Sequence, residues 1–344
     1  MHGVKRFTPE KRAAMRRENE ERAISYRARS AAAMERRRQK IYDSTSLEAV
    51  EKVVIENPDF ATLWNFRREI LLHMHSDADE QSKRNACQQE FALTQECLGV
   101  NPKSYPVWFH REWVVRWGEC SWHLATELKL TSKLLALDDR NFHCWTYRRS
   151  IVRIAGVEAE AELHFTTSKI ESNFSNYSAW HYRSKLLPQI HSESGALRGV
   201  LRCELELVRN AFYTAPEDSS AWFYHRWLLA QLASGPSATI CPADFEDTVR
   251  DELRMTAELI ELEPDCKWPL ATASYLGRIA QHHGVSFVDE MTTTANVQLE
   301  DLQRVDPFRS RHYLDVSRSD ASNTQTLPSG RWVRQSGGFY MPSR

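Results

Sequence analysis

The sequence lacks most short motifs that carry chemistry on their own. Its seven cysteines are an odd number, and no two of them form a Cys-x-x-Cys pair, so neither a disulfide framework nor a zinc finger is predicted. It also has no glycine-rich phosphate loop, no recognisable set of metal ligands, and no nucleophile spaced from a base as in known motifs. No apolar run is long enough to cross a bilayer, and the first residues lack the apolar core of a signal peptide. We therefore expect a soluble protein from a reducing compartment, the cytoplasm.

Charge is unevenly distributed along the chain. Residues 1–43 contain 13 Lys or Arg and 6 Asp or Glu, a balance of +7, whereas the whole chain carries −1. This segment has few helix breakers, so we expect a basic N-terminal helical arm. A nucleic-acid or anionic-lipid site is the alternative, but interleaved Glu and the absence of an aromatic platform favour a solvated helix that packs lightly on the rest.

Tryptophan, by contrast, is abundant, and six of the 11 Trp residues belong to a repeated unit. A short turn rich in Asn, Asp and Pro precedes each of these Trp, and an Arg follows three residues later in the first four copies. The repeated Trp–Arg pairs are Trp64 and Arg67, Trp108 and Arg111, Trp145 and Arg148, and Trp180 and Arg183; Trp222 is followed by His225, and Trp268 by Ala271. Repeats of this length are typical of helical solenoids.

Each unit is predicted to be a hairpin of two helices. An amphipathic run precedes every turn, and the Trp lies on the second helix, so the two helices must be antiparallel. We expect Ser104, Asn176 and Ser219 to cap second helices. Each Trp should fill the gap to the next hairpin, while each Arg should bind carbonyls or acids in the adjoining turn.

The pattern predicts an all-α fold, a right-handed superhelical array of about six or seven antiparallel hairpins. We place this helical-repeat crescent at residues 44–316. Near its end, 296–307 reads as a last helix that stops at Asp-Pro. A tail at 317–344, rich in Ser, Gly and Arg, is expected to be flexible.

The repeat also resembles a known family. Asn101-Pro102-x-x-Tyr105-x-x-Trp108-x-x-Arg111 is similar to the α-subunit repeat of protein prenyltransferases, and the similarity extends from about Leu47 to Ala271. Within that family the Rab geranylgeranyltransferase branch is the most similar, because of the opening Met1-His2-Gly3-Val4-Lys5 and the forms of the first and third repeats.

This resemblance implies a role as one subunit of an enzyme. The family's α subunit wraps a β subunit that holds the isoprenoid pocket and the catalytic zinc. The donor would be geranylgeranyl diphosphate, and the acceptors would be C-terminal Cys residues of Rab GTPases presented by an escort protein. No nucleic acid and no membrane span are implied.

The family also suggests site residues. Lys103 lies just before a predicted helix N-terminus, where N–H donors and the helix dipole favour an anion. On sequence alone a solvated Lys in a turn is the simpler interpretation. In the family, the Lys of the Pro-Lys-x-Tyr motif reaches the diphosphate of the donor, and Lys103 with Tyr105 match this motif.

Two further positions come from the third repeat and the N-terminus. Asn141 and His143 match the family's loop that faces the isoprenoid and peptide pocket, although Phe142 between them lacks a hydroxyl. Without the family, a helix cap and a partly buried His explain these two residues equally well. His2 could reach the zinc of the β subunit as a regulatory ligand, while disorder is the alternative for a residue so near the end.

Two other functions remain open from the sequence. The first is the α subunit shared by farnesyltransferase and geranylgeranyltransferase I, against which Phe142 and the two ends of the chain argue. The second is a non-enzymatic helical scaffold that binds peptides. A scaffold would not need the pairs Lys103/Tyr105 and Asn141/His143.

Overall fold

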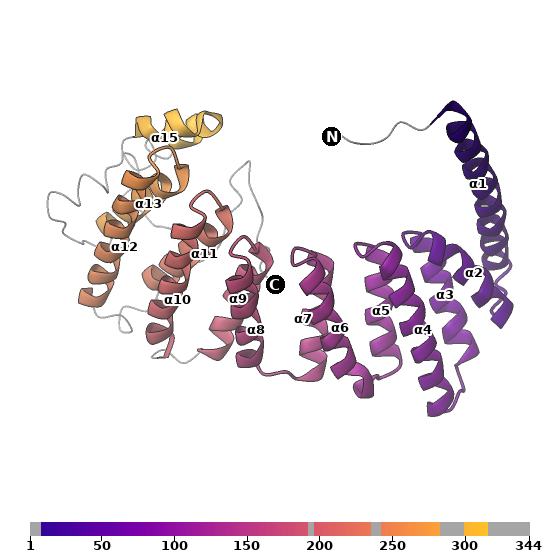
Figure 1. The fold of residues 1–344 in the computed structure, drawn as a ribbon. Coiled ribbons are helices and arrows are strands. Elements are labelled where there is room, and N and C mark those ends of the chain that lie inside the picture. Colours follow the sequence, from indigo (N-terminus) through magenta and orange to yellow (C-terminus); the bar gives the residue numbers. More distant parts are fainter. Residues whose placement is uncertain (1–7, 192–195, 235–241, 283–298, 316–344) are drawn as a thin grey trace. The chain divides into compact units, whose positions relative to one another are not determined.

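A computed structural model describes residues 8–191, 196–234, 242–282 and 299–315. These residues are mostly α-helical, with no strand among them (Figure 1). The chain divides into two units, Met1–Val157 and Glu158–Arg344. The predicted all-α helical-repeat fold is confirmed. His2 and the tail 317–344 lie outside the described residues. None of the described helices combines the length and the apolar character needed to cross a membrane.

Unit 1 contains a long N-terminal helix and three hairpins. Helix α1 is followed by the hairpins α2/α3, α4/α5 and α6/α7, whose two helices pack on each other. Their bounds are α1 (Pro9–Arg38), α2 (Ser44–Glu56), α3 (Ala61–Met74), α4 (Glu80–Val100), α5 (Tyr105–Trp117), α6 (Leu124–Leu137) and α7 (Phe142–Ala155), with a 3-10 turn η1 (Ser121–His123) before α6.

Unit 2 contains three more hairpins of the same kind, α8/α9, α10/α11 and α12/α13. Their bounds are α8 (Ala159–Ser172), α9 (Tyr177–Ile190), α10 (Ala196–Thr214), α11 (Ser219–Ser234), α12 (Pro242–Leu262) and α13 (Lys267–His282). A short helix α15 (Leu299–Val305) then packs on α13 and ends before Asp306-Pro307, where the sequence predicted a stop.

The turns inside the hairpins are built by Asx side chains. The side-chain oxygens of Asn57, Asn101 and Asp138 accept backbone N–H groups two residues later, at 3.2, 3.0 and 3.1 Å. Such Asx turns stop a helix because they offer the backbone an alternative partner. The first helix of each of these hairpins therefore ends where the sequence indicates.

The predicted caps are only partly correct. Asn176 caps α9 by accepting the N–H of Ala179 at 3.1 Å. Ser219 is wrong by one position, because α11 already begins there and the Asp218 carboxylate accepts the N–H of Ser220 at 2.8 Å. Ser104 holds the cap position of α5, but its hydroxyl donates to the Pro58 carbonyl instead, at 3.0 Å.

The Trp residues of the first five repeats bond to their own turns, and three of them also contact the next repeat. In the first five repeats the indole N–H donates to the carbonyl six residues earlier: Trp64 to Pro58, Trp108 to Pro102, Trp145 to Asp139, Trp180 to Phe174 and Trp222 to Pro216, all at 2.7–2.9 Å. The rings reach forward as well: that of Trp64 lies 4.7 Å from His110, that of Trp108 lies 5.1 Å from Tyr147, and that of Trp180 lies 4.9 Å from Tyr224, between centroids. A buried Trp thus has a hydrogen-bond acceptor for its indole N–H and packs its ring between hairpins.

The repeated Arg residues reach a different target from the one predicted. The Arg111 guanidinium forms two hydrogen bonds with the Glu127 carboxylate, at 2.7 and 2.6 Å, and donates to the Phe91 carbonyl at 2.8 Å. Tyr147 donates to the same carboxylate at 2.6 Å. Glu127 lies on the first helix of the next hairpin, not in the adjoining turn. From this helix, the buried Glu127 carboxylate can accept hydrogen bonds both from Arg111 and from Tyr147, which lies on the second helix of its own repeat.

The same arrangement recurs in both units. Arg67 pairs with Glu90, which also bonds His110, and Arg183 pairs with Glu204, which also bonds Tyr224. Arg148 donates to the hydroxyls of Thr131 and Ser132 on α6. Buried charges need such complete pairing because desolvation of an unpaired ion is costly.

Helix α1 is mostly exposed, as expected for a lightly packed arm. Of its residues only Ala33 is fully buried. Near its end Arg36 binds the Asp43 carboxylate at 2.7 Å, while in the middle Tyr26 accepts a hydrogen bond from Asn57 at 2.7 Å. The first half of α1 thus projects beyond these contacts.

Candidate functional site

Two predicted site residues meet at the beginnings of α5 and α7. Tyr105 is the first residue of α5, and His143 lies in the first turn of α7. Their rings pack edge to face with centroids 4.1 Å apart, and Phe142 approaches Tyr105 at 6.1 Å. Tyr105 is 68% exposed and Phe142 is 53% exposed, so these two rings of the aromatic cluster face outward.

Lys103 lies in the turn just before this cluster. Its Nζ is 3.2 Å from the Asp138 carboxylate, and its side chain remains 61% exposed. Exposed ion pairs of this kind contribute only about 0–1 kcal/mol, so the ammonium can exchange partners at little cost. Because the Ser104 hydroxyl is bonded to Pro58, α5 has no side-chain cap, and its N-terminus keeps its attraction for an anion.

Asn141 is occupied by structural contacts. Its Oδ1 accepts the N–H groups of His143 and Cys144 at 3.1 and 3.2 Å, and its Nδ2 donates to the Pro102 carbonyl at 2.9 Å. The residue is only 3% exposed. These contacts are those of a helix cap that also ties the third repeat to the second, and they leave Asn141 little capacity to bind a ligand.

The His143 side chain is buried. It is 6% exposed, and burial lowers the pKa of its imidazole, with the nearby positive charge of Lys103 acting in the same direction. The ring is therefore neutral at neutral pH. A neutral imidazole next to the Tyr105 ring can orient that ring or accept a hydrogen bond, but it adds no second positive charge.

Sequence reasoning missed the acids around this site. Asp138 pairs with Lys103, and the Asp59 carboxylate accepts a hydrogen bond from Asn101 at 2.9 Å. It also missed the glutamates of the buried Arg clusters. A signal existed, because Glu90, Glu127 and Glu204 each stand 18 residues before the Trp of their repeat.

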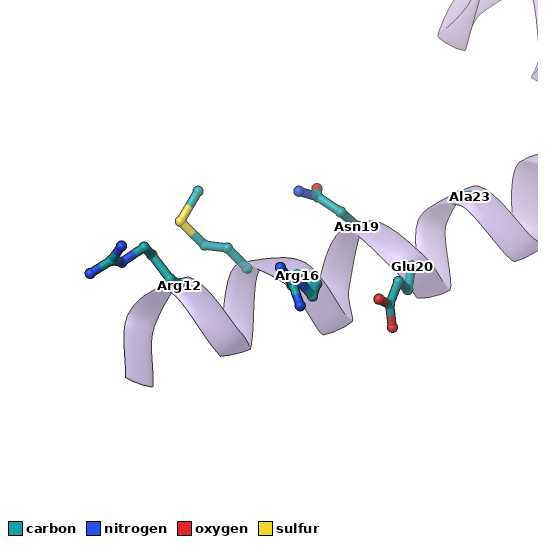
Figure 2. A pocket seen from close by; sticks show the side chains of 6 residues that line it. Arg12, Arg16, Asn19, Glu20 and Ala23 are labelled. Carbon is teal, nitrogen blue, oxygen red and sulfur yellow. The ribbon is translucent and has the colours of Figure 1, made fainter. Parts of the chain in front are cut away.

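The depression along α1 does not belong to this site. Arg12, Met15, Arg16, Asn19, Glu20 and Ala23 line it, all on one helix and at spacings that form a single stripe (Figure 2). Among the described residues only α1 lines it, so these residues form no enclosed space for a ligand there. Within the described ranges, no three His, Cys, Asp or Glu side chains are grouped as a metal ion would require. His2, the suggested zinc ligand, lies outside these ranges.

The repeats match a known family model. The protein prenyltransferase alpha subunit repeat is recognised at residues 43–74, 87–118, 124–155, 159–190 and 201–232. These segments coincide with the first five hairpins, including the two whose turns carry Lys103, Tyr105 and His143. The fold and the repeat thus define an α-subunit repeat protein of the prenyltransferase class.

Curated relatives narrow this class. Geranylgeranyl transferase type-2 subunit alpha of Dictyostelium discoideum is 42% identical over 281 residues, which cover 80% of this chain and 88% of that protein. The subunit of the same name from Candida albicans is 30% identical over 368 residues, covering 93% and 98%. That of Rattus norvegicus is 45% identical over 250 residues, which cover 70% of this chain but only 43% of the rat protein. This chain thus spans less than half the length of its mammalian relatives.

A solved structure agrees on the fold. "Candida albicans protein geranylgeranyltransferase-I complexed with GGPP" superposes with a TM-score of 0.61 at 20% identity, covering 86% of this chain and 90% of that one. The chain belongs to the family of geranylgeranyl transferase type-2 alpha subunits, within the protein prenyltransferase alpha subunits.

Proposed function

We propose that this chain is the α subunit of a heterodimeric Rab geranylgeranyltransferase. With a β subunit it transfers geranylgeranyl from geranylgeranyl diphosphate to C-terminal Cys residues of Rab GTPases presented by an escort protein, in the cytoplasm. The observation that carries the proposal is the 42% identity with the Dictyostelium type-2 α subunit over 88% of that protein. The exposed Lys103 and Tyr105, with His143 packed against the Tyr105 ring, support it.

In this proposal Lys103 stabilises the leaving diphosphate. When the prenyl carbon–oxygen bond breaks, negative charge grows on the diphosphate, and an ammonium placed there lowers the barrier. Asp138 holds the Lys103 side chain at 3.2 Å before the substrate binds. A diphosphate carries more charge than one carboxylate, so it can draw the exposed ammonium away from Asp138.

Tyr105 and His143 shape the surface beside that charge. The Tyr105 ring is held against the His143 imidazole at 4.1 Å, which fixes where its exposed hydroxyl lies. That hydroxyl can donate a hydrogen bond to a phosphate oxygen. Asn141 contributes by holding His143 at the start of α7 rather than by touching the substrate.

Zinc, which activates the acceptor thiolate when bound, is assigned to the β subunit. The described part of this chain offers no group of three His, Cys, Asp or Glu side chains. His2 is kept as a candidate regulatory ligand of the same zinc. The active centre is proposed to be completed only in the heterodimer, as the similarity to prenyltransferase α subunits suggests.

Reconstitution tests the proposal. The full chain should copurify with a type-2 β subunit and transfer geranylgeranyl to a Rab protein in the presence of the escort protein. Lys103→Ala should lower turnover about 100-fold with nearly unchanged isoprenoid affinity, because the lost charge acts mainly in the transition state. Lys103→Arg should recover part of the rate, and Lys133→Ala, on the exposed face of α6, is the matched control.

The role of Lys103, the enzyme assignment and the Rab-type assignment can each be contradicted separately. Wild-type turnover in Lys103→Ala would remove Lys103 from the site while leaving the subunit assignment intact. A chain that stays monomeric, and with which no β subunit supports transfer to Rab, would sink the enzyme proposal and favour a scaffold. Transfer to a short C-terminal Cys peptide without the escort protein would favour the farnesyltransferase/geranylgeranyltransferase I type.

A further inference from the structure

Two buried thiols face each other at the far end of the second hairpin, away from the turn that carries Lys103. Cys87 lies in the first half of α4, and Cys120 lies in the turn between α5 and η1. They are 0% and 1% exposed, respectively. Both cysteines are free in the structure.

The space around Gly118 shows how close the two sulfur atoms are. A Cβ at this position would stand 2.2 Å from Cys87 Sγ and 2.8 Å from Cys120 Sγ, so the sulfurs lie no farther apart than the sum of these distances. Gly118 has an ordinary negative φ of −89°, so its backbone does not require glycine. The thiol pair requires glycine here, because the two sulfur atoms occupy the space that a Cβ would need.

The surroundings make the two thiols chemically unequal. The neighbouring Cys120 side chain lowers the pKa of the Cys87 thiol, and the charge of Lys83, one turn earlier, acts in the same direction, while burial opposes both. The pKa of Cys120 is raised. A thiol whose pKa is lowered, next to a second thiol, is the arrangement that oxidants attack first. Cys97, in the same helix, differs because burial raises its pKa to about 12.

We propose that Cys87 and Cys120 are a reversible oxidation site that forms an intramolecular disulfide with hydrogen peroxide. The Cys87 sulfur attacks one peroxide oxygen, the O–O bond breaks, and water and a sulfenic acid result. The Cys120 sulfur then displaces the sulfenic oxygen as a second water, with the thiol protons going to the two waters. Two thiols thus supply the two electrons that reduce one peroxide. Glu119 and Ser121 on either side of Cys120 are exposed, so a small local opening of this turn admits the oxidant.

Peptide mapping tests this site. The reduced full chain is treated with hydrogen peroxide, remaining thiols are alkylated, and tryptic peptides are analysed by mass spectrometry. The expected product joins peptide 85–103 to peptide 117–129 with the loss of two hydrogens, and dithiothreitol reverses it. Cys87→Ser and Cys120→Ser should each abolish the cross-link, whereas Cys97→Ser should keep it, which assigns the bond within peptide 85–103.

A glycine pair supplies the structural control. Gly118→Ala should slow cross-linking at least tenfold, because the added methyl group forces the sulfurs apart. Gly99→Ala, whose Cβ meets nothing within 4 Å, should leave the rate unchanged. Circular dichroism confirms that each variant is folded. The proposal is overturned if the folded chain yields no cross-link, if Cys97 is the partner, or if Cys87 proceeds to sulfinic acid while Cys120 stays reduced.

Discussion

Glu127 in unit 1 and Glu252 in unit 2 are buried carboxylates at related places in their repeats, but different partners hold them. Glu127 is bound by Arg111, the Arg three residues after a repeated Trp, and both side chains are almost fully buried. Glu252 is bound by His225, which replaces that Arg, and by Arg209 from the preceding first helix, whose side chain is 32% exposed. What the array preserves is a paired buried acid, not one particular base.

Removal of the buried acid should therefore give the largest difference in stability loss between the two units. Glu127→Ala leaves Arg111 buried without a counter-charge and should lower the free energy of unfolding by about 3–5 kcal/mol. Glu252→Ala should cost about 1–3 kcal/mol, because Arg209, whose side chain is 32% exposed, can turn toward water. Urea denaturation of the full chain measures both, and equal losses would contradict the comparison.

The repeated Trp residues should differ in a similar way. Trp108 is 5% exposed and donates to its own turn at 2.9 Å, whereas Trp268 is only half-buried and donates at 3.2 Å to Glu217 of the previous repeat. Trp108→Ala should cost about 3–5 kcal/mol, and Trp268→Ala about 1–2 kcal/mol. Phe at either position serves as the matched control, since it keeps most of the ring. A larger loss at Trp268 would show that the last repeat is not a weakened copy.

Acid should weaken unit 1 through its buried glutamates. Arg67 and His110 hold the pKa of Glu90 down to about 2, and His123 and Arg111 do the same for Glu127, although burial by itself opposes both shifts. A lowered folded pKa gives stability that is present above the unfolded value of 4.5 and is lost as the pH falls toward 2. Each acid contributes on the order of 3 kcal/mol over that window.

Unfolding free energies measured from pH 7 to pH 3 test this. The decline should begin near pH 5, and Glu127→Gln should be less stable at pH 7 but show a shallower decline. An unchanged slope in this variant would mean that other carboxylates control the acid response.

The smallest difference concerns serine hydroxyls that link consecutive repeats. Ser104 donates to the Pro58 carbonyl at 3.0 Å, and Ser220 donates to the Ser175 carbonyl at 3.3 Å. Ser104→Ala should cost about 1 kcal/mol, because Pro58 keeps its bond from Trp64, and Ser220→Ala about half as much. Thermal melts of the two variants resolve the order, with Ser172→Ala as the control, because the exposed Ser172 hydroxyl donates to the Lys169 carbonyl of its own helix.

Part of this structure could be predicted from the sequence because it depends on local periodicity. The Trp spacing predicted the hairpins, and Asn101-Pro102 predicted the end of α4, since an Asx turn needs only neighbouring residues. The cap of α11 was missed by one residue, because Asp218 and Ser219 are both good caps and local preference does not separate them. The partner of Arg111 was missed because Glu127 lies on another helix, where only packing decides the contact.

In the candidate site, too, some features follow from local sequence and others only from packing. The sequence by itself determined that Lys103 precedes a helix and that Tyr105 opens it, because turn chemistry and helix start signals act within a few residues. Only the tertiary structure decided that His143 packs on Tyr105, that Asp138 holds Lys103, and that Asn141 is consumed as a cap. It also brought Cys87 and Cys120 together around Gly118, although they lie 33 positions apart in the chain. The physical reason is that a repeat specifies its own turn, whereas the contacts between helices and between repeats arise only when they pack.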